Sequence, residues 1–150
     1  LLEYLEQTRS RFGSMFGERV SEQAAVQQKI GESYEELRTS DLIIDNLCHY
    51  LHEQGQAGNS IVGGDRLKIR RETAMAAQLC MKSGTRLSGM MGVTAQTGRN
   101  PAQRMFRDLR TMSTHGGIHW DNATTPTGSY LLGIETGDPL IDENNKFLNT

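Results

Sequence analysis

The sequence has few cysteines, no excess of basic residues and no long apolar run, and each absence excludes a class of protein. Cys48 and Cys80 lack the spacing of a metal site and fit small buried positions in a reducing cytoplasm. The 16 basic and 18 acidic residues give a net charge of −2, which is not a nucleic-acid-binding footprint. Without a membrane-spanning run or a signal-peptide pattern, we expect a cytoplasmic protein with no membrane or nucleic-acid partner.

Helical periodicity dominates the 150 residues, a length that suits one domain with a core. Residues 1–12 read as the end of a helix, and residues 22–54 carry an apolar stripe at the near-heptad spacing typical of helical bundles. A further helix is predicted over residues 66–91, with Asp65 as its N-cap, and a short one over residues 124–132.

The last part of the chain has a different composition. Residues 134–150 are acidic and amide-rich and contain a Gly-Asp-Pro turn, so we predict no helix there. The sequence therefore predicts a helical domain over residues 1–133 and a tail over residues 134–150. Because the chain begins inside a helical pattern, we also expect it to be part of a longer protein.

One more helix begins at Asn100, which suits the N-cap, and Pro101, which suits the first helical position. Within this helix Arg104 and Asp108 are spaced for an ion pair, and one apolar face is predicted to be buried: Met105, Leu109 and Met112. Gly116-Gly117 ends the helix and leaves His115 at its C-terminal end. There His115 is either a histidine stabilised by the helix dipole or a chemical group beside a close-approach loop.

Two motifs give the chain a family resemblance. From Asn100 it reads Asn-Pro-x-Gln-Arg-x-x-Arg-Asp-Leu, followed by a Thr-His pair at positions 114 and 115. Upstream, Arg9-Ser-Arg-Phe12-Gly13 matches an Arg-x-x-Phe-Gly motif. Both resemble the C-terminal domain of acyl-CoA dehydrogenase-like flavin monooxygenases. The resemblance implies an all-α, up-down four-helix bundle that assembles as a homotetramer and carries only part of an active site.

The same resemblance implies roles for particular residues. Arg9, Phe12 and Thr114 would contact flavin, and His115 would lie beside the flavin ring and the substrate hydroxyl. Gly92 matches the first glycine of a Gln-x-x-Gly-Gly run that approaches the adenosine part of FAD in related dehydrogenases. Val93 replaces the second glycine, so the choice between FMN and FAD stays open.

The implied function is that of the oxygenase component of a two-component monooxygenase. A separate flavin reductase would supply reduced FMN or FAD transiently, and a C4a-hydroperoxyflavin would hydroxylate a small aromatic substrate, phenolic or related. His115 would hold the substrate hydroxyl or hydrogen-bond the peroxide.

Three other interpretations are open. An acyl-CoA dehydrogenase is the nearest, but its catalytic Glu aligns with Gly116, which cannot take a proton. A non-catalytic helical oligomerisation domain is the second. A metal site at His115 and His119 is the third, but it lacks the Glu that follows the first His in zinc helices, so we predict no metal.

Overall fold

The computed structural model describes residues 20–93, 97, 100–143 and 145, and these residues form helices and connecting loops without a strand. A short 3-10 helix precedes five α-helices: η1 (Val20–Glu22), α2 (Ala24–Gln56), α3 (Gly64–Met90), α4 (Pro101–Ser113), α5 (Trp120–Leu131) and α6 (Pro139–Asp142). The predicted all-α fold is thereby confirmed. The helix predicted over residues 1–12 lies outside the described residues.

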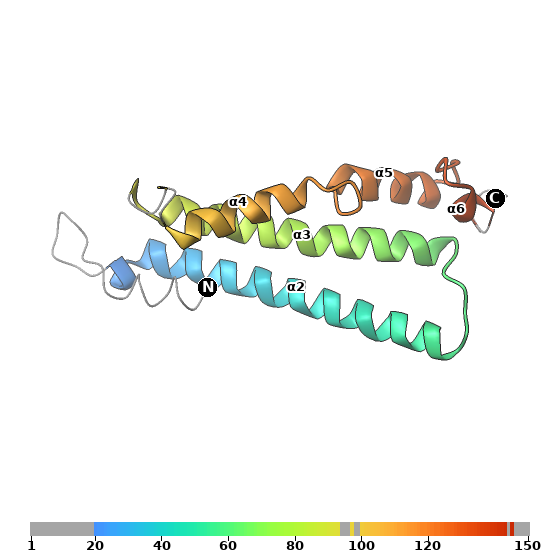
Figure 1. Ribbon diagram of the computed structural model, residues 1–150, viewed down its shortest axis with the longest axis horizontal. Coiled ribbons are helices and arrows are strands. Elements are labelled where there is room, and N and C mark those ends of the chain that lie inside the picture. The colour runs from blue at the N-terminus through green and yellow to red at the C-terminus, as the bar shows by residue number, and fades with distance from the viewer. Residues whose placement is uncertain (1–19, 94–96, 98–99, 144, 146–150) are drawn as a thin grey trace.

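The described helices lie in three antiparallel columns (Figure 1). The long helices α2 and α3 pack along each other, and α4 and α5 follow one another back along α3. Since α4 and α5 together span the length of α3, the loop between them lies near the middle of the molecule. That loop contains His115, so the fold places the candidate residue on the flank of α3.

Small polar residues lie where α2 meets α3. Ser40 donates through Oγ to the carbonyl of Ala76 at 3.2 Å and lies 3.3 Å from the sulfur of Cys80. Ser33 and Ser83 are almost completely buried. Short side chains let the two helix backbones approach closely, which explains the modest apolar core. The prediction that both cysteines are buried was wrong, because Cys80 is only partly buried and Cys48 is exposed.

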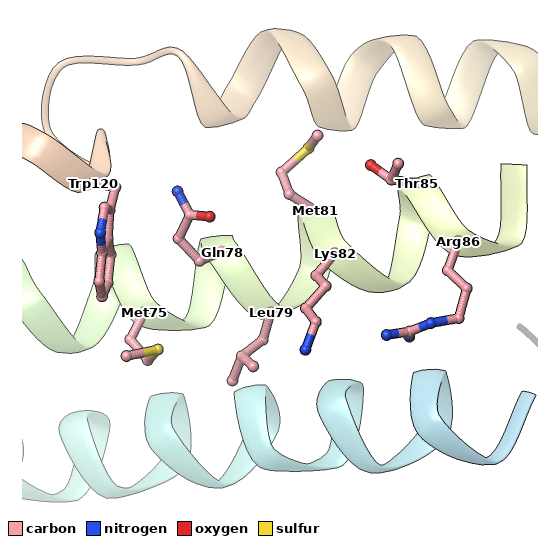
Figure 2. A pocket seen from close by; sticks show the side chains of 8 residues that line it. All are labelled: Met75, Gln78, Leu79, Met81, Lys82, Thr85, Arg86 and Trp120. Carbon is pink, nitrogen blue, oxygen red and sulfur yellow. The ribbon is translucent and has the colours of Figure 1, made fainter. Parts of the chain in front are cut away.

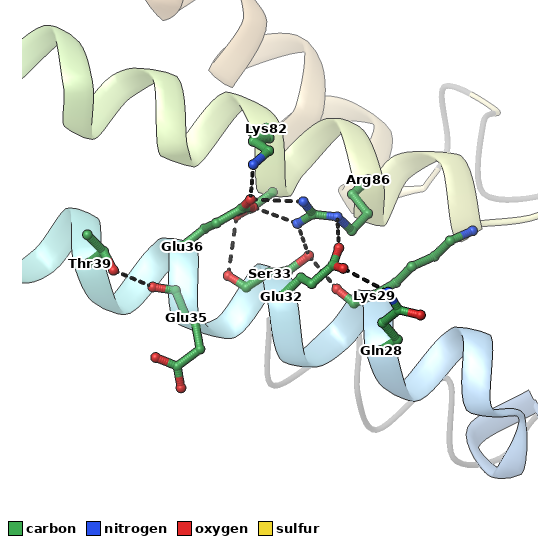
Figure 3. Close-up of polar contacts among 10 residues, drawn as sticks. Gln28, Lys29, Glu32, Ser33, Glu35, Glu36, Thr39, Lys82 and Arg86 are labelled. Carbon is green, nitrogen blue, oxygen red and sulfur yellow. Dashed lines mark hydrogen bonds and ion pairs between the residues drawn. The ribbon is translucent and has the colours of Figure 1, made fainter.

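An ion-pair cluster links α2 to α3 (Figure 3). The guanidinium of Arg86 donates twice to the carboxylate of Glu36, at 2.6 and 2.9 Å. Lys82 and Ser83 also contact this carboxylate, at 2.7 and 2.9 Å. The hydrogen bonds from Arg86, followed by those from Lys82 and Ser83, outweigh the effect of burial and lower the pKa of Glu36 to about 2. The cluster therefore fixes the register of α2 against α3.

The start of α3 differs from the prediction. Gly63 occupies the N-cap position with a φ of 54°, a left-handed conformation that favours glycine. Asp65, predicted as the cap, lies in the first turn of the helix instead. Its carboxylate accepts a hydrogen bond from Tyr50, which together with burial raises the pKa of Tyr50 to about 12. Asp65 thus joins α2 to α3 rather than capping α3.

Helix α5 begins four residues earlier than predicted and includes Pro126 in its interior. The hydroxyls of Thr124 and Thr127 donate to the carbonyls of Trp120 and Ala123, at 3.0 and 2.8 Å. Each hydroxyl thus bonds to a carbonyl one turn earlier in the helix. The two threonines lie on either side of Pro126 in the sequence. The earlier start places Trp120 at the first position of α5, directly after the His115 loop.

The tail contains a helix, contrary to the prediction of none. Asp138 caps α6 by accepting from the backbone N–H of Leu140 at 3.1 Å, and Pro139 follows as the first helical residue. Ile141 is completely buried and forms a cluster with Leu67 and Tyr130. The composition of the tail concealed one apolar anchor, which is enough to dock α6 against α3.

Candidate functional site

Helix α4 carries the candidate residues at its C-terminal end. The Oδ1 atom of Asn100 accepts from the backbone N–H of Ala102 at 2.9 Å, and Pro101 follows the cap, as predicted. The last helical residue is Ser113, and Thr114 takes the C-cap position. The Asn-Pro signal therefore sets where α4 starts, and its length of 13 residues sets where His115 emerges.

Only part of the predicted apolar face of α4 packs on α3. Met105 and Met112 are 62% and 63% exposed, so the prediction that they are buried was wrong for this chain. Leu109, as predicted, and Phe106 point to α3, where a Cβ on Gly84 would lie 2.5 Å from Leu109 Cδ2. These two residues lie on one edge of the apolar stripe of α4 and the two methionines lie on the other, so periodicity alone did not identify the edge that meets α3.

Hydrogen bonds hold the loop that follows α4 in a defined turn. The backbone N–H of Gly117 donates to His115 Nδ1 at 3.2 Å, and the N–H of Ile118 donates to the carbonyl of His115 at 3.0 Å. The side-chain amide of Asn122, on α5, donates to the carbonyl of Gly116 at 3.2 Å. The imidazole of His115 is exposed but oriented, which suits a residue that meets a ligand.

Thr114 lies beside His115 and is also exposed. Its hydroxyl donates to the carbonyl of Thr111 at 2.7 Å, so its proton is used while its oxygen can still accept. The ion pair predicted between Arg104 and Asp108 is present, at 3.5 Å and on the exposed side of α4. At that exposure it adds little to stability.

Trp120 borders two hollows along α3. A groove of about 650 Å³ follows α3, and Figure 2 shows Met75 and Leu79 pointing from it towards α2 while Trp120 stands at one end. A smaller hollow of about 290 Å³ shares Met75 and Trp120 and is lined by Ile43 and Glu72 among others. Trp120 therefore forms a wall of both hollows and is not part of the buried core.

A third hollow adjoins the His115 loop. It has a volume of about 440 Å³ and is lined by Gly116, Gly117, Arg70 and the start of α5, including Asp121 and Asn122. Its lining combines backbone groups with a cation, a carboxylate and an amide. Such a surface favours a small molecule that carries hydroxyl groups over an acyl chain.

The other predicted site residues do not join His115. Arg9 and Phe12 lie outside the described residues. Gly92 is exposed and follows the end of α3 where α4 begins, whereas His115 follows the other end of α4. A helix of 13 residues separates these ends by about 20 Å. Gly92 and His115 thus cannot contact the same flavin ring, although they could contact different parts of a flavin or two different flavins.

The described residues fit one edge of a flavin site. Thr114 and His115 present an acceptor oxygen and an imidazole N–H on an open surface, and a Cβ on Gly92 would meet nothing within 4 Å. These groups suit the polar edge of a planar ring and the close approach of a nucleotide. Among the described residues they lie on an open surface and form one wall of such a site.

The described residues contain neither a metal-binding cluster nor a membrane-spanning helix. In the part of the chain that the structure describes, no three His, Cys, Asp or Glu side chains come together in a way that could hold a metal ion. Within the same residues, no helix combines the length and apolarity needed to cross a membrane.

The fold and the α4–α5 corner define a helical domain with a candidate site at the His115 loop. Residues 1–120 match the family model of the acyl-CoA dehydrogenase C-terminal domain. Because this match covers most of the chain, the protein belongs to that family, as its motifs predict.

Two curated proteins that are similar to this chain are both named as hydroxylases. The chain is 24% identical over 138 residues to the pigment production hydroxylase of Rhodococcus sp. (strain ATCC 21145), a match that covers 92% of this chain and 35% of the relative. It is 29% identical over 82 residues to the oxygenase component of the FADH(2)-dependent resorcinol hydroxylase of Rhizobium sp. (strain MTP-10005), covering 55% and 20% of the two chains. The chain therefore spans about a third of the first relative and a fifth of the second.

Proposed function

We propose that this chain is the C-terminal domain of the oxygenase component of a two-component, flavin-dependent monooxygenase. The observation that carries the proposal is the oriented, exposed His115 at the end of α4, in a domain of the acyl-CoA dehydrogenase family. Both relatives named above are hydroxylases, and one is named as FADH(2)-dependent. A separate reductase would supply the reduced FMN or FAD.

Bound reduced flavin would supply the activation of molecular oxygen. The residues of this chain would bind the flavin and the substrate and orient them. His115 would hold the substrate hydroxyl, and Thr114 would meet the edge of the flavin ring, with Arg9, Phe12 and Gly92 as further flavin contacts. The open hollow beside Gly117 would receive a hydroxyl-bearing part of the substrate that extends from the group held at His115.

The substrate class we propose is a small phenol or a related aromatic compound. The polar lining of the hollow beside the His115 loop supports this class, because hydroxyl groups on a ring could pair with Asn122 or Asp121. Dehydrogenation of an acyl-CoA is disfavoured, because Gly116 stands where that reaction needs a carboxylate. No other residue of the turn offers one.

We also propose a homotetrameric, cytoplasmic assembly. Large apolar side chains remain exposed on α2 and α4, on surfaces that the described part of the chain does not cover: Tyr34, Leu42, Ile44, Leu51, Met105 and Met112. Exposed large apolar side chains are typical of surfaces where subunits meet. Such contacts would also bring a second chain to the open side of the site.

The test is a turnover experiment under ¹⁸O₂ with the complete protein, a flavin reductase, NADH and resorcinol or related phenols. The proposal predicts a hydroxylated product that carries one oxygen atom from O₂. Product oxygen that comes from water, or desaturation of an acyl-CoA instead of hydroxylation, would contradict it. Omitting the reductase while adding chemically reduced flavin controls for the source of reducing equivalents.

A further inference from the structure

We infer that His115 acts as a hydrogen-bond donor through Nε2–H and not as a general base, and that the backbone N–H of Gly117 fixes this tautomer. The inference rests on the proposed function and specifies how the site would use its histidine. It also identifies Gly117 as a positioning residue, because it acts on the substrate only through His115.

The tautomer follows from one hydrogen bond. A neutral imidazole carries a single N–H, and the nitrogen without it is an acceptor. The N–H of Gly117 points to Nδ1 at 3.2 Å, so Nδ1 must supply the lone pair. The proton of the neutral ring therefore lies on Nε2, on the opposite side of the ring. In the described part of the chain Nε2 has no hydrogen-bond partner, and the side chain is exposed to a ligand.

The turn is built to make this contact. A Cβ on Gly117 would lie 3.3 Å from Nδ1 and 3.4 Å from Cε1 of His115, so a side chain there would press on the ring. At Gly116 the nearest atom to a Cβ is Asn122 Nδ2, at an ordinary 3.8 Å. The loop thus needs a glycine at 117 more than at 116. The bond from Asn122 to the Gly116 carbonyl ties the turn to the first turn of α5.

The tautomer limits what His115 can do to a phenol. To accept the phenol proton at Nε2, the ring would first have to move its own proton to Nδ1 and break the bond from Gly117. As a donor, Nε2–H instead stabilises an oxygen that already carries negative charge. The favoured substrate is therefore bound as a phenolate, whose proton has left to solvent. The negative charge also makes the aromatic ring a better nucleophile.

The first test reads the tautomer directly, without turnover. Histidine labelled with ¹⁵N is incorporated into the complete protein, and solid-state NMR of the sedimented protein resolves the ring nitrogens, with His115→Gln identifying the signals that belong to this residue. We expect an unprotonated Nδ1 and a protonated Nε2 at a pH where the ring is neutral. The reverse pattern would overturn the inference. Gly117→Ala should produce a mixture of tautomers, and Gly116→Ala, the matched control, should leave the pattern unchanged.

The second test separates donor from base. Glutamine places an amide N–H near the position of Nε2 but cannot take up a proton at neutral pH. We expect His115→Gln to keep hydroxylation within about 10-fold of the unmodified protein, and His115→Ala to lose about 100-fold. Equal losses in both variants would overturn the donor role. If neither variant loses hydroxylation while the NMR pattern is as expected, the tautomer stands and the proposed role of His115 fails.

Discussion

Replacing His115 by alanine should lower the rate of substrate hydroxylation by about 100-fold. The side chain is exposed, and among the described residues the Gly117 N–H alone bonds to its ring, so its removal should leave the helices intact. Lost orientation of the substrate should let reducing equivalents escape as hydrogen peroxide. Product and peroxide are therefore measured together, and peroxide should rise as product falls.

The matched control is His49→Ala. His49 is also an exposed histidine, but it lies on α2, away from the α4–α5 loop, so hydroxylation should be unchanged. Helix content by circular dichroism and the elution volume of the assembly should be the same in both variants. Unchanged hydroxylation in His115→Ala, with the fold intact, would contradict the role of this residue.

Replacing Glu36 by glutamine should destabilise the protein by about 2 kcal/mol at pH 7. This value is reduced from that of a fully buried ion pair because solvent partly screens the cluster. The change removes the carboxylate that pairs Lys82 and Arg86, and leaves Arg86, whose side chain is only 14% exposed, with the more exposed Glu32 at 3.2 Å. Urea unfolding of the helical signal measures the difference. The expected loss is large because three side chains of α3 contact the Glu36 carboxylate of α2: Lys82, Ser83 and Arg86.

The difference in unfolding free energy between the unmodified protein and Glu36→Gln should depend on pH, and the pKa of Glu36 determines its sign. The pKa of Glu36 is about 2 in the folded chain and 4.5 as its usual value, so folding favours the charged form. The stabilisation is complete above about pH 4.5 and is lost as the pH falls towards 2. The two unfolding free energies should therefore converge in acid.

Glu35→Gln is the control for this prediction. Glu35 neighbours Glu36 on α2, but Figure 3 shows its side chain pointing away from α3, and it is exposed. Its substitution should change the unfolding free energy by less than about 0.5 kcal/mol. A Glu36→Gln protein as stable as Glu35→Gln, or a difference that persists at pH 2, would show that the cluster does not hold α2 against α3.

Local signals in the sequence predicted local structure well. The Asn100-Pro101 pair located the start of α4, and the Gly116-Gly117 pair located its end near His115. Each signal depends on backbone groups within one turn, where a few side chains decide the conformation. The family motifs predicted the type of domain, because they include the residues of these same turns.

Contacts between distant residues were not predictable. Glu36 and Arg86 are 50 residues apart, and neither belongs to a motif. Asp65 had the right chemistry for a cap, yet the nearby Tyr50 takes its carboxylate as a partner. Ile141 lay in a tail whose composition indicated a loop, and a single buried side chain anchored it.

The sequence identified only part of the buried face of α4, for a different reason. Met105 and Met112 follow a helical repeat that correctly marks an apolar surface, but the sequence does not say what covers it. Within the chain α4 meets α3 through Phe106 and Leu109. We propose that the methionine face is covered when subunits assemble, which periodicity cannot distinguish from burial inside one chain.

The most direct test of the flavin-dependent oxygenase function is the reaction of protein-bound reduced flavin with oxygen. The complete protein is mixed anaerobically with reduced FMN, and separately with reduced FAD, and flavin absorbance is followed after oxygen is added. We predict that one of the two flavins binds and that its return to the oxidised spectrum is markedly slower than that of free flavin. Reoxidation of both flavins at the rate of free flavin would contradict the proposed function.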